Sequence, residues 1–177
     1  RQMCIRDRLL GMPSYGGTYR FATIELPARG VKTRFIGDFT ALTDEDFADN
    51  VTMVFLESPS NPLLRVSDIA AIAEIAHRNG AIVVVDNTFM TPLLQKPLDL
   101  GADISVQSAT KYLGGHADLL GGVAATNDDA LAERLWHLQM ITGAMLSPTD
   151  SYRLLQEVKT LKPVSYTHLR AHETVLD

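Results

Sequence analysis

The sequence reads SVQSATKYLGG from Ser105 to Gly115, directly after an apolar run that predicts the end of a strand. Burying a lysine is costly unless its pKa falls or its amine reacts, because an ammonium group is strongly hydrated. An amine next to hydroxyl side chains suits a Schiff base to a phosphorylated aldehyde, with Lys111 on the aldehyde carbon and Ser108 and Thr110 on the phosphate. An ordinary loop of the form Ser-x-Thr-Lys is the alternative interpretation.

A second apolar run ends in an acid. Residues 81–85 read AIVVV, which is typical of a strand buried on both faces of a parallel sheet. Asp86 follows, and open parallel sheets bind ligands beyond the carboxyl ends of their strands. A carboxylate there can pair with a pyridinium nitrogen, which makes the ring an electron acceptor. Asp86 precedes Lys111 by 111 − 86 = 25 residues, enough for a return to the same edge; a turn or N-cap aspartate is the alternative.

Four motifs resemble those of one enzyme family. They are YGGTYR at 15–20, ESPSNP at 57–62, VDNTF at 85–89 and SATKYLGGH at 108–116. They are similar to motifs of the pyridoxal-phosphate-dependent enzymes of Cys and Met metabolism, which include cystathionine γ-synthase, cystathionine β- and γ-lyases and methionine γ-lyase. The resemblance runs from about Gly11 to about Lys162. It implies the large domain of a fold type I transferase, a pyridoxal 5'-phosphate cofactor and a small amino-acid substrate.

The resemblance also implies roles for single residues. Lys111 binds the cofactor and then moves protons as a general base and acid, and Asp86 holds the ring nitrogen. Tyr15 stacks on the ring, a contact worth about 0.5–1.5 kcal/mol beyond burial, and assists proton transfer. Asn61 helps to hold the cofactor or the substrate carboxylate. The alternatives are a core or turn tyrosine and a loop-stabilising asparagine, and we interpret His116 as part of the loop structure.

Apolar runs alternating between strand and helix periods predict an α/β protein, a three-layer α/β/α sandwich with a mostly parallel sheet. We expect Ser67 to cap a helix that ends before Gly80, and Trp136 to pack in the core. No GxGxxG stands between a strand and a helix, so a dinucleotide-binding module is the weaker alternative. The expected strands are 31–36, 51–56, 81–85 and 103–107, with an apolar return at 119–125; the expected helices include a short one from 43 and longer ones at 128–142 and 148–161.

Both ends of the chain depart from the family pattern. We expect residues 1–8 and 164–177 to be non-native, translated from sequencing adaptors, and residues 9–163 to be a partial cofactor-binding large domain. The alternative for the tail is a genuine amphipathic helix, whose His168 and His172 mimic a metal-binding pair; we expect no metal site. By resemblance, the chain is an internal fragment that lacks segments completing the active site. We therefore expect the fragment itself to bind cofactor weakly and to be nearly inactive.

The composition limits the expected classes of binding partner and indicates a cellular compartment. The net charge of −5 and the pI of about 5.5 argue against nucleic acids and acidic membranes as partners. The single cysteine, Cys4, cannot form an internal disulfide, which favours the cytoplasm. No apolar run approaches the ~18–20 residues of a membrane span. The resemblance implies that the parent enzyme is a homotetramer.

The reaction expected by resemblance is trans-sulfuration. It is elimination or replacement at Cβ or Cγ of a sulfur amino acid or an activated homoserine, by a cystathionine γ-synthase or a cystathionine lyase. Methionine γ-lyase and O-acylhomoserine sulfhydrylase are the alternatives within the family, and a non-catalytic remnant of the fold is the alternative of another class. A decayed site should have lost at least one of five residues that are all present here: Asn61, Asp86, Ser108, Thr110 and Lys111.

Overall fold

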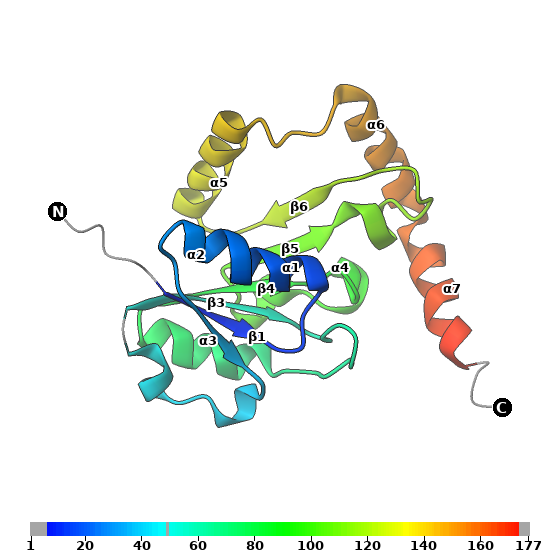
Figure 1. Ribbon diagram of the computed structural model, residues 1–177. Helices are drawn as coiled ribbons and strands as arrows, with labels where there is room; N and C mark the ends of the chain where they lie inside the picture. The colour runs from blue at the N-terminus through cyan, green and yellow to red at the C-terminus, as the bar shows by residue number, and fades with distance from the viewer. Residues whose placement is uncertain (1–6, 49, 174–177) are drawn as a thin grey trace. The chain divides into compact units, whose positions relative to one another are not determined.

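The computed structural model describes residues 7–48 and 50–173, which form two compact units (Figure 1). Unit 1 contains the chain up to Asn87 together with Pro97–Ser105, and unit 2 contains Thr88–Lys96 and the chain from Val106 onward. Strand β5 (Ile104–Ser108) therefore begins in unit 1 and ends in unit 2. Cys4 and the side chain of His172 lie outside the described residues.

Unit 1 contains a parallel sheet in the strand order β2-β1-β3-β4. At its β4 edge, the backbone N–H of Asp103, just before β5, donates to the carbonyl of Val83. Strands 31–36, 51–56 and 81–85 are confirmed within one or two residues at each end, whereas β1 was not among the expected strands. The strands are β1 (Asp7–Gly11), β2 (Thr33–Ile36), β3 (Val51–Glu57) and β4 (Ile82–Asp86).

The core of unit 1 lies between the sheet and helix α3 (Ile69–Arg78). Side chains alternate across a strand, so Leu9, Val54 and Leu56 share the face that packs against α3. Leu10 and Val84 on the other face are buried as well, which confirms the expected two-sided burial. Helices α1 (Gly16–Arg20) and α2 (Leu26–Ala28), joined by a π-helical segment at Phe21–Glu25, lie on the side of β1 and β3 opposite α3 (Figure 1). Unit 1 thus has the predicted α/β/α layers.

The cap of α3 differs from the prediction by one residue. The Asp68 carboxylate, not Ser67, accepts from the backbone N–H of Ala71. Ser67 uses its backbone groups instead, which pair with the hydroxyl of Ser58. Gly80 follows the helix with a φ of 73°, as its position after the helix predicted.

Replacing Asp68 with alanine is expected to lower the free energy of unfolding by about 0.5–2 kcal/mol, because one helix N–H loses its acceptor. Ser67→Ala is the matched control, since its backbone bonds to Ser58 do not need the Ser67 hydroxyl. Urea unfolding followed by circular dichroism measures both. A larger loss for Ser67→Ala would restore the original assignment of the cap.

The connections of unit 1 are short helical turns. The short helix expected from residue 43 is present as a 3₁₀ turn with a capping box, in which the side chain of Asp46 accepts from the backbone N–H of Thr43 over 2.9 Å. The turns are 3₁₀ helices at Phe39–Ala41, Asp44–Phe47 and Pro97–Leu100.

Unit 2 is mainly helical. A small core forms around the turn that carries Lys111, from Ala109, Leu113, Leu119 and Leu161. Trp136 does not pack in a core: its side chain is 61% exposed, and no residue of its helix is buried. The elements are α4 (Thr91–Leu94), the π-helical η5 (Ala109–Leu113), β6 (Gly122–Ala125), α5 (Asp129–Thr142), α6 (Pro148–Glu157), a 3₁₀ turn (Val158–Thr160) and α7 (Leu161–Glu173).

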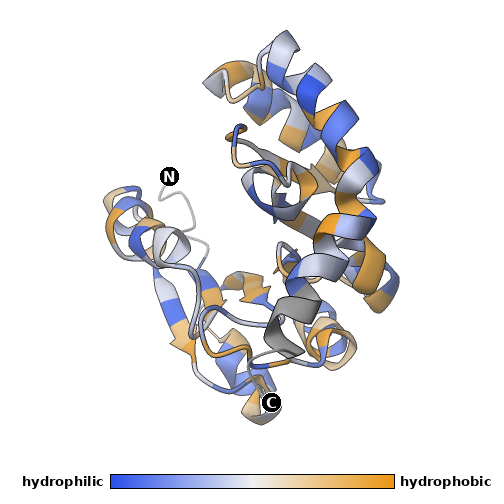
Figure 2. Cartoon of the chain, turned by 90° about the vertical axis from the view of Figure 1, so that its right-hand side faces the viewer, coloured by the Kyte–Doolittle hydropathy of each residue, from blue (hydrophilic) through white to orange (hydrophobic). Residues whose placement is uncertain are grey.

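The helices mix hydrophobic and hydrophilic positions (Figure 2). Within the described part of the chain, no helix has the length and apolar character needed to cross a membrane. Strand β1 begins at Asp7 and α7 continues to Glu173, so regular structure extends into both segments expected to be non-native. Their origin stays a prediction.

Candidate active site

Two acids end neighbouring strands of unit 1. Glu57 is the last residue of β3 and Asp86 the last of β4, and the two are direct partners in the parallel register. By strand alternation both lie on the face of the sheet opposite α3. The expected position of Asp86 at the carboxyl edge of the sheet is therefore confirmed, with a second carboxylate next to it.

The carboxylate of Glu57 bonds two separate segments. Its Oε1 accepts from the backbone N–H of Tyr15 over 2.7 Å, and its Oε2 accepts from the backbone N–H of Asn61 over 3.1 Å. Tyr15 is the residue before α1, and Asn61 lies in the turn that follows β3. Glu57 thus fixes the backbone of two predicted site residues.

The environment of Glu57 raises the pKa of its carboxyl group above the ordinary value of 4.5. Burial is the main cause, since only 7% of the residue is exposed, and the negative charge of Asp86 adds to it. The hydrogen bonds from Tyr15 and Asn61 lower the pKa but do not cancel these effects. Glu57 therefore holds a proton more readily than a glutamate in water.

This raised pKa predicts a pH dependence of stability. The folded protein binds the Glu57 proton more tightly than the unfolded chain, so this contribution to stability is present below pH 4.5 and is lost as the pH rises through the folded-state pKa. Urea unfolding of the wild type and of Glu57→Gln at several pH values isolates the effect. The stability of the wild type relative to the variant should fall as the pH rises; a flat or rising difference would contradict the assignment.

The loop after β3 is closed at its base. The buried Ser58 hydroxyl accepts from the backbone N–H of Ser67 over 3.0 Å and donates to the Ser67 carbonyl. Inside this loop, the backbone N–H of Arg65 donates to the hydroxyl of Ser60. These bonds hold Asn61 within a defined turn.

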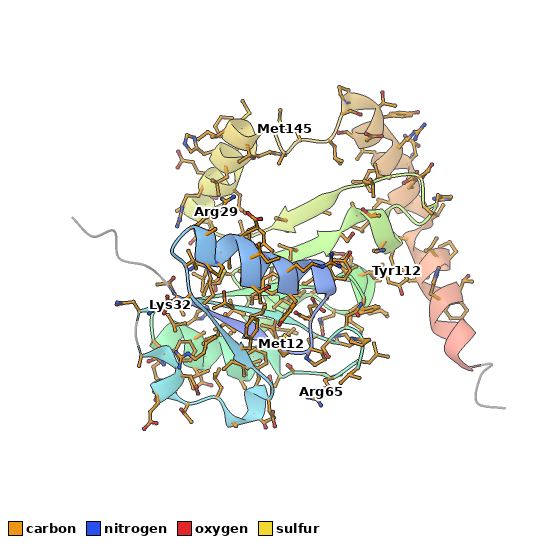
Figure 3. All side chains as sticks on the ribbon, in the orientation of Figure 1. Met12, Arg29, Lys32, Arg65, Tyr112 and Met145 are labelled. Carbon is orange, nitrogen blue, oxygen red and sulfur yellow. The ribbon has the colours of Figure 1, made fainter. Side chains whose placement is uncertain are left out.

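A cavity of about 460 Å³ lies next to these residues in unit 1. It begins where β1, β2 and β3 end, at Gly11, Gly37 and Glu57. Met12 and Arg65, labelled in Figure 3, also line it. The cavity is therefore on the strand edge where parallel sheets bind ligands.

The ring of Tyr15 folds back over a glycine. A Cβ atom added to Gly17 would lie 2.6 Å from Cε1 of Tyr15, whereas one added to Gly16 would meet no atom within 4 Å. Of the two neighbouring glycines, only Gly17 lies against the Tyr15 ring. Gly17 provides the space in which the phenol ring lies.

Lys111 lies on a kinked turn in unit 2. It has φ −94° and ψ −121° within η5, and its backbone carbonyl accepts from the N–H of Gly115 over 2.7 Å. The N–H of Gly114 donates to Ala109, whose carbonyl oxygen would lie 2.8 Å from a Cβ at position 114. Glycine is therefore required at 114. The Lys111 side chain is exposed, so the described chain does not bury its amine.

The hydroxyl residues before Lys111 have different partners. The Thr110 hydroxyl accepts from the backbone N–H of Gly121 over 3.0 Å and donates to the Gly121 carbonyl over 3.3 Å. The backbone N–H of Ser108 donates to the Thr88 hydroxyl over 2.8 Å, and the Ser108 side chain does not cap η5. The Ser108 hydroxyl is thus better placed to donate to a phosphate. The Thr110 hydroxyl would first have to give up its hydrogen bond to the Gly121 carbonyl.

Each unit brings together part of the predicted site. Unit 1 gathers Tyr15, Asn61 and Asp86 around Glu57. Unit 2 places Ser108 at the end of β5, and Thr110 and Lys111 in the turn that follows. Sequence reasoning missed the roles of Glu57 and Thr88. The available signal was local: Glu57 begins the ESPSNP motif at the end of an apolar run, and Thr88 follows Asp86 within the VDNTF motif.

Comparison with known proteins identifies the family of the chain. The family model described as Cys/Met metabolism PLP-dependent enzyme matches residues 7–173. The chain belongs to this family. The Cys/Met metabolism family depends on pyridoxal phosphate, and the motif resemblance found in the sequence is confirmed.

Relatives in the Cys/Met metabolism family include lyases and synthases. The chain is 44% identical over 149 residues to cystathionine gamma-lyase of Bacillus subtilis (strain 168), covering 83% of this chain and 39% of that protein. It is 45% identical to cystathionine gamma-lyase of Dictyostelium discoideum, covering 90% and 40%. The chain thus spans about two fifths of the length of these relatives.

Solved structures give the same family and fold. Cystathionine gamma-lyase from Lactobacillus plantarum, complexed with L-serine, matches with a TM-score of 0.83 and 38% identity over 90% of this chain and 42% of that one. Cystathionine gamma synthase from Xanthomonas oryzae pv. oryzae, in complex with aminoacrylate and cysteine, gives 0.84 and 36% over 89% and 41%. The chain has the α/β fold of type I pyridoxal-phosphate enzymes.

Proposed function

We propose that the whole protein to which this chain corresponds eliminates or replaces a group at Cβ or Cγ of a sulfur amino acid or an activated homoserine. The observation that supports this most is the exposed Lys111 amine on a kinked turn directly after β5, preceded by two hydroxyl residues. The named relatives are cystathionine lyases and synthases, and the solved relatives hold serine, aminoacrylate or cysteine.

The residues present fit pyridoxal phosphate by their chemistry. Unit 2 offers an amine for the aldehyde, at Lys111, and hydroxyl groups for phosphate oxygens, at Ser108 and Thr110. Unit 1 offers the Asp86 carboxylate for the ring nitrogen and the Tyr15 ring for stacking. When bound, the cofactor supplies an electron-accepting ring that stabilises negative charge at the substrate Cα.

The proposed chemistry of the chain's own residues is proton transfer. The Lys111 amine takes the proton from the substrate Cα and returns it where the reaction requires it, to Cβ, Cγ or the leaving group. The Asp86 carboxylate accepts a hydrogen bond from the protonated ring nitrogen and so holds that proton in place. Tyr15 stacks on the ring and assists the transfer. Asn61 helps to orient the cofactor or the substrate carboxylate.

The choice among the reactions of the family is part of the proposal. Cystathionine γ-synthase and cystathionine lyase are the preferred assignments, because relatives of both kinds match at 42–47% identity. A homotetrameric assembly and a cytoplasmic location are also proposed. They are supported by the motif resemblance and by the presence of a single cysteine.

The test is product analysis with the full-length reading frame that contains this chain. The purified protein is loaded with pyridoxal phosphate and incubated with cystathionine, with methionine, and with an acylhomoserine plus cysteine. Release of pyruvate or 2-oxobutyrate indicates a lyase, and formation of cystathionine indicates a synthase. A protein that binds the cofactor yet converts none of these substrates would refute the proposed function.

A further inference from the structure

We propose that Glu57 is a positioning residue for the cofactor site, a role that rests on the function proposed above. Its single carboxylate fixes Tyr15, before α1, and Asn61, after β3, through their backbone N–H groups. Tyr15 is 42 residues away in the chain and Asn61 only 4. Glu57 therefore acts through Tyr15 and Asn61. It joins the end of β3 to the start of α1 and to the loop that follows β3.

The geometry requires a carboxylate rather than an amide. Each of the two oxygens faces an N–H donor, at 2.7 and 3.1 Å. Glutamine would offer one carbonyl oxygen and one NH₂ group, so one of the two N–H groups would face another donor. Hydrogen bonds to an ionised group are also stronger than those between neutral groups.

The charge of Glu57 is not balanced by a cation in the described chain. The ion pairs His77–Asp103 and Arg78–Asp44 do not include Glu57, and its strand neighbour is the acidic Asp86. Burying a carboxylate next to another carboxylate is unfavourable unless the buried charge is hydrogen-bonded or paired. The two backbone N–H groups compensate for part of this cost, which ties their positions to the ionised state of Glu57.

The bond from the Tyr15 backbone to Glu57 also helps to orient the Tyr15 side chain. With the Tyr15 backbone held by Glu57 and the space over Gly17 open, the phenol ring has a defined direction. The bond to Asn61 acts inside a loop whose base is closed separately, by Ser58 and Ser67. Losing the Glu57 carboxylate should therefore release two predicted cofactor contacts while leaving the loop base intact.

The experiment compares Glu57→Gln with Glu74→Gln, which makes the same chemical change at an exposed position of α3. Amide hydrogen exchange of the unliganded chain is the first readout. In Glu57→Gln, the protection of the Tyr15 and Asn61 amides should fall about 10- to 100-fold, the equivalent of a lost charge-assisted bond. The Arg65 and Ser67 amides, bonded to other side chains, are internal controls.

The second readout is the dissociation constant for pyridoxal phosphate, which should rise about tenfold in Glu57→Gln and stay unchanged in Glu74→Gln. Glu57→Asp keeps two acceptor oxygens and should recover part of both effects, which guards against a variant that folds poorly. Unchanged protection in Glu57→Gln would overturn the proposal, and so would lost protection with unchanged affinity. A full-length wild-type protein that captures no cofactor at Lys111 would overturn the proposed function instead, a failure that the exchange data do not share.

Discussion

Replacing Lys111 with alanine is expected to abolish covalent capture of pyridoxal phosphate and to lower turnover of the whole enzyme by at least about 10²–10⁴-fold. The amine is both the covalent attachment point and the group that moves protons, and general acid–base catalysis alone accounts for a factor of this size. Incubation with pyridoxal phosphate, reduction with borohydride and mass spectrometry of the peptides measure the capture. In the wild type the pyridoxyl group should be found on Lys111.

Lys96→Ala is the matched control for this experiment. Lys96 is another exposed lysine of unit 2, and it lies outside the turn that carries Lys111. It should leave the labelling of Lys111 unchanged, because a lysine elsewhere has neither the kinked turn nor the preceding hydroxyl groups. Equal labelling of the wild type and Lys111→Ala would show that the amine has been assigned to the wrong residue.

Replacing Leu56 with alanine is expected to destabilise unit 1 by about 2–5 kcal/mol. Leu56 is only 1% exposed and belongs to the core between the sheet and α3, so its loss removes buried apolar contacts and leaves a cavity. It also precedes Glu57 on the same strand, but its side chain points to the other face. Urea unfolding followed by circular dichroism gives the difference in free energy.

Leu63→Ala provides the control for Leu56→Ala. Leu63 is 59% exposed in the loop after β3, so the same substitution should change the stability by no more than about 0.5 kcal/mol. If both variants lost the same stability, the effect would come from leucine as a residue type rather than from its place in the core. That result would contradict the packing of α3 against β3.

The parts of the fold that the sequence predicted depend on local patterns. Apolar β-branched runs located β3 and β4, and the acidic turn from Thr43 to Asp46 located a capped helical turn. The same applies to the candidate site. Asp86 directly follows an apolar run and ends β4, and Lys111 lies in the turn that follows β5, so both places could be inferred from neighbouring residues alone.

The parts that could not be predicted depend on distant contacts. The bond between Glu57 and Tyr15 joins residues 42 positions apart, and nothing in either motif indicates the other as its partner. Ser67 and Asp68 are both good N-cap residues, and only the use of the Ser67 backbone by Ser58 separates them. Trp136 is apolar enough for a core, but whether a helix face is covered depends on what packs against it.

Gly16 and Gly17 of the YGGTYR motif should differ in how well they tolerate substitution. A library that varies both positions should keep small residues at 16, where a side chain would enter open space, and select against side chains at 17, where a Cβ would lie 2.6 Å from the Tyr15 ring. The cost at 17 would not arise in the backbone, which has no left-handed conformation there. It would arise because the Tyr15 ring would have to move away from the new Cβ atom. Position 17 therefore favours glycine because glycine has only a hydrogen atom where other residues have a Cβ.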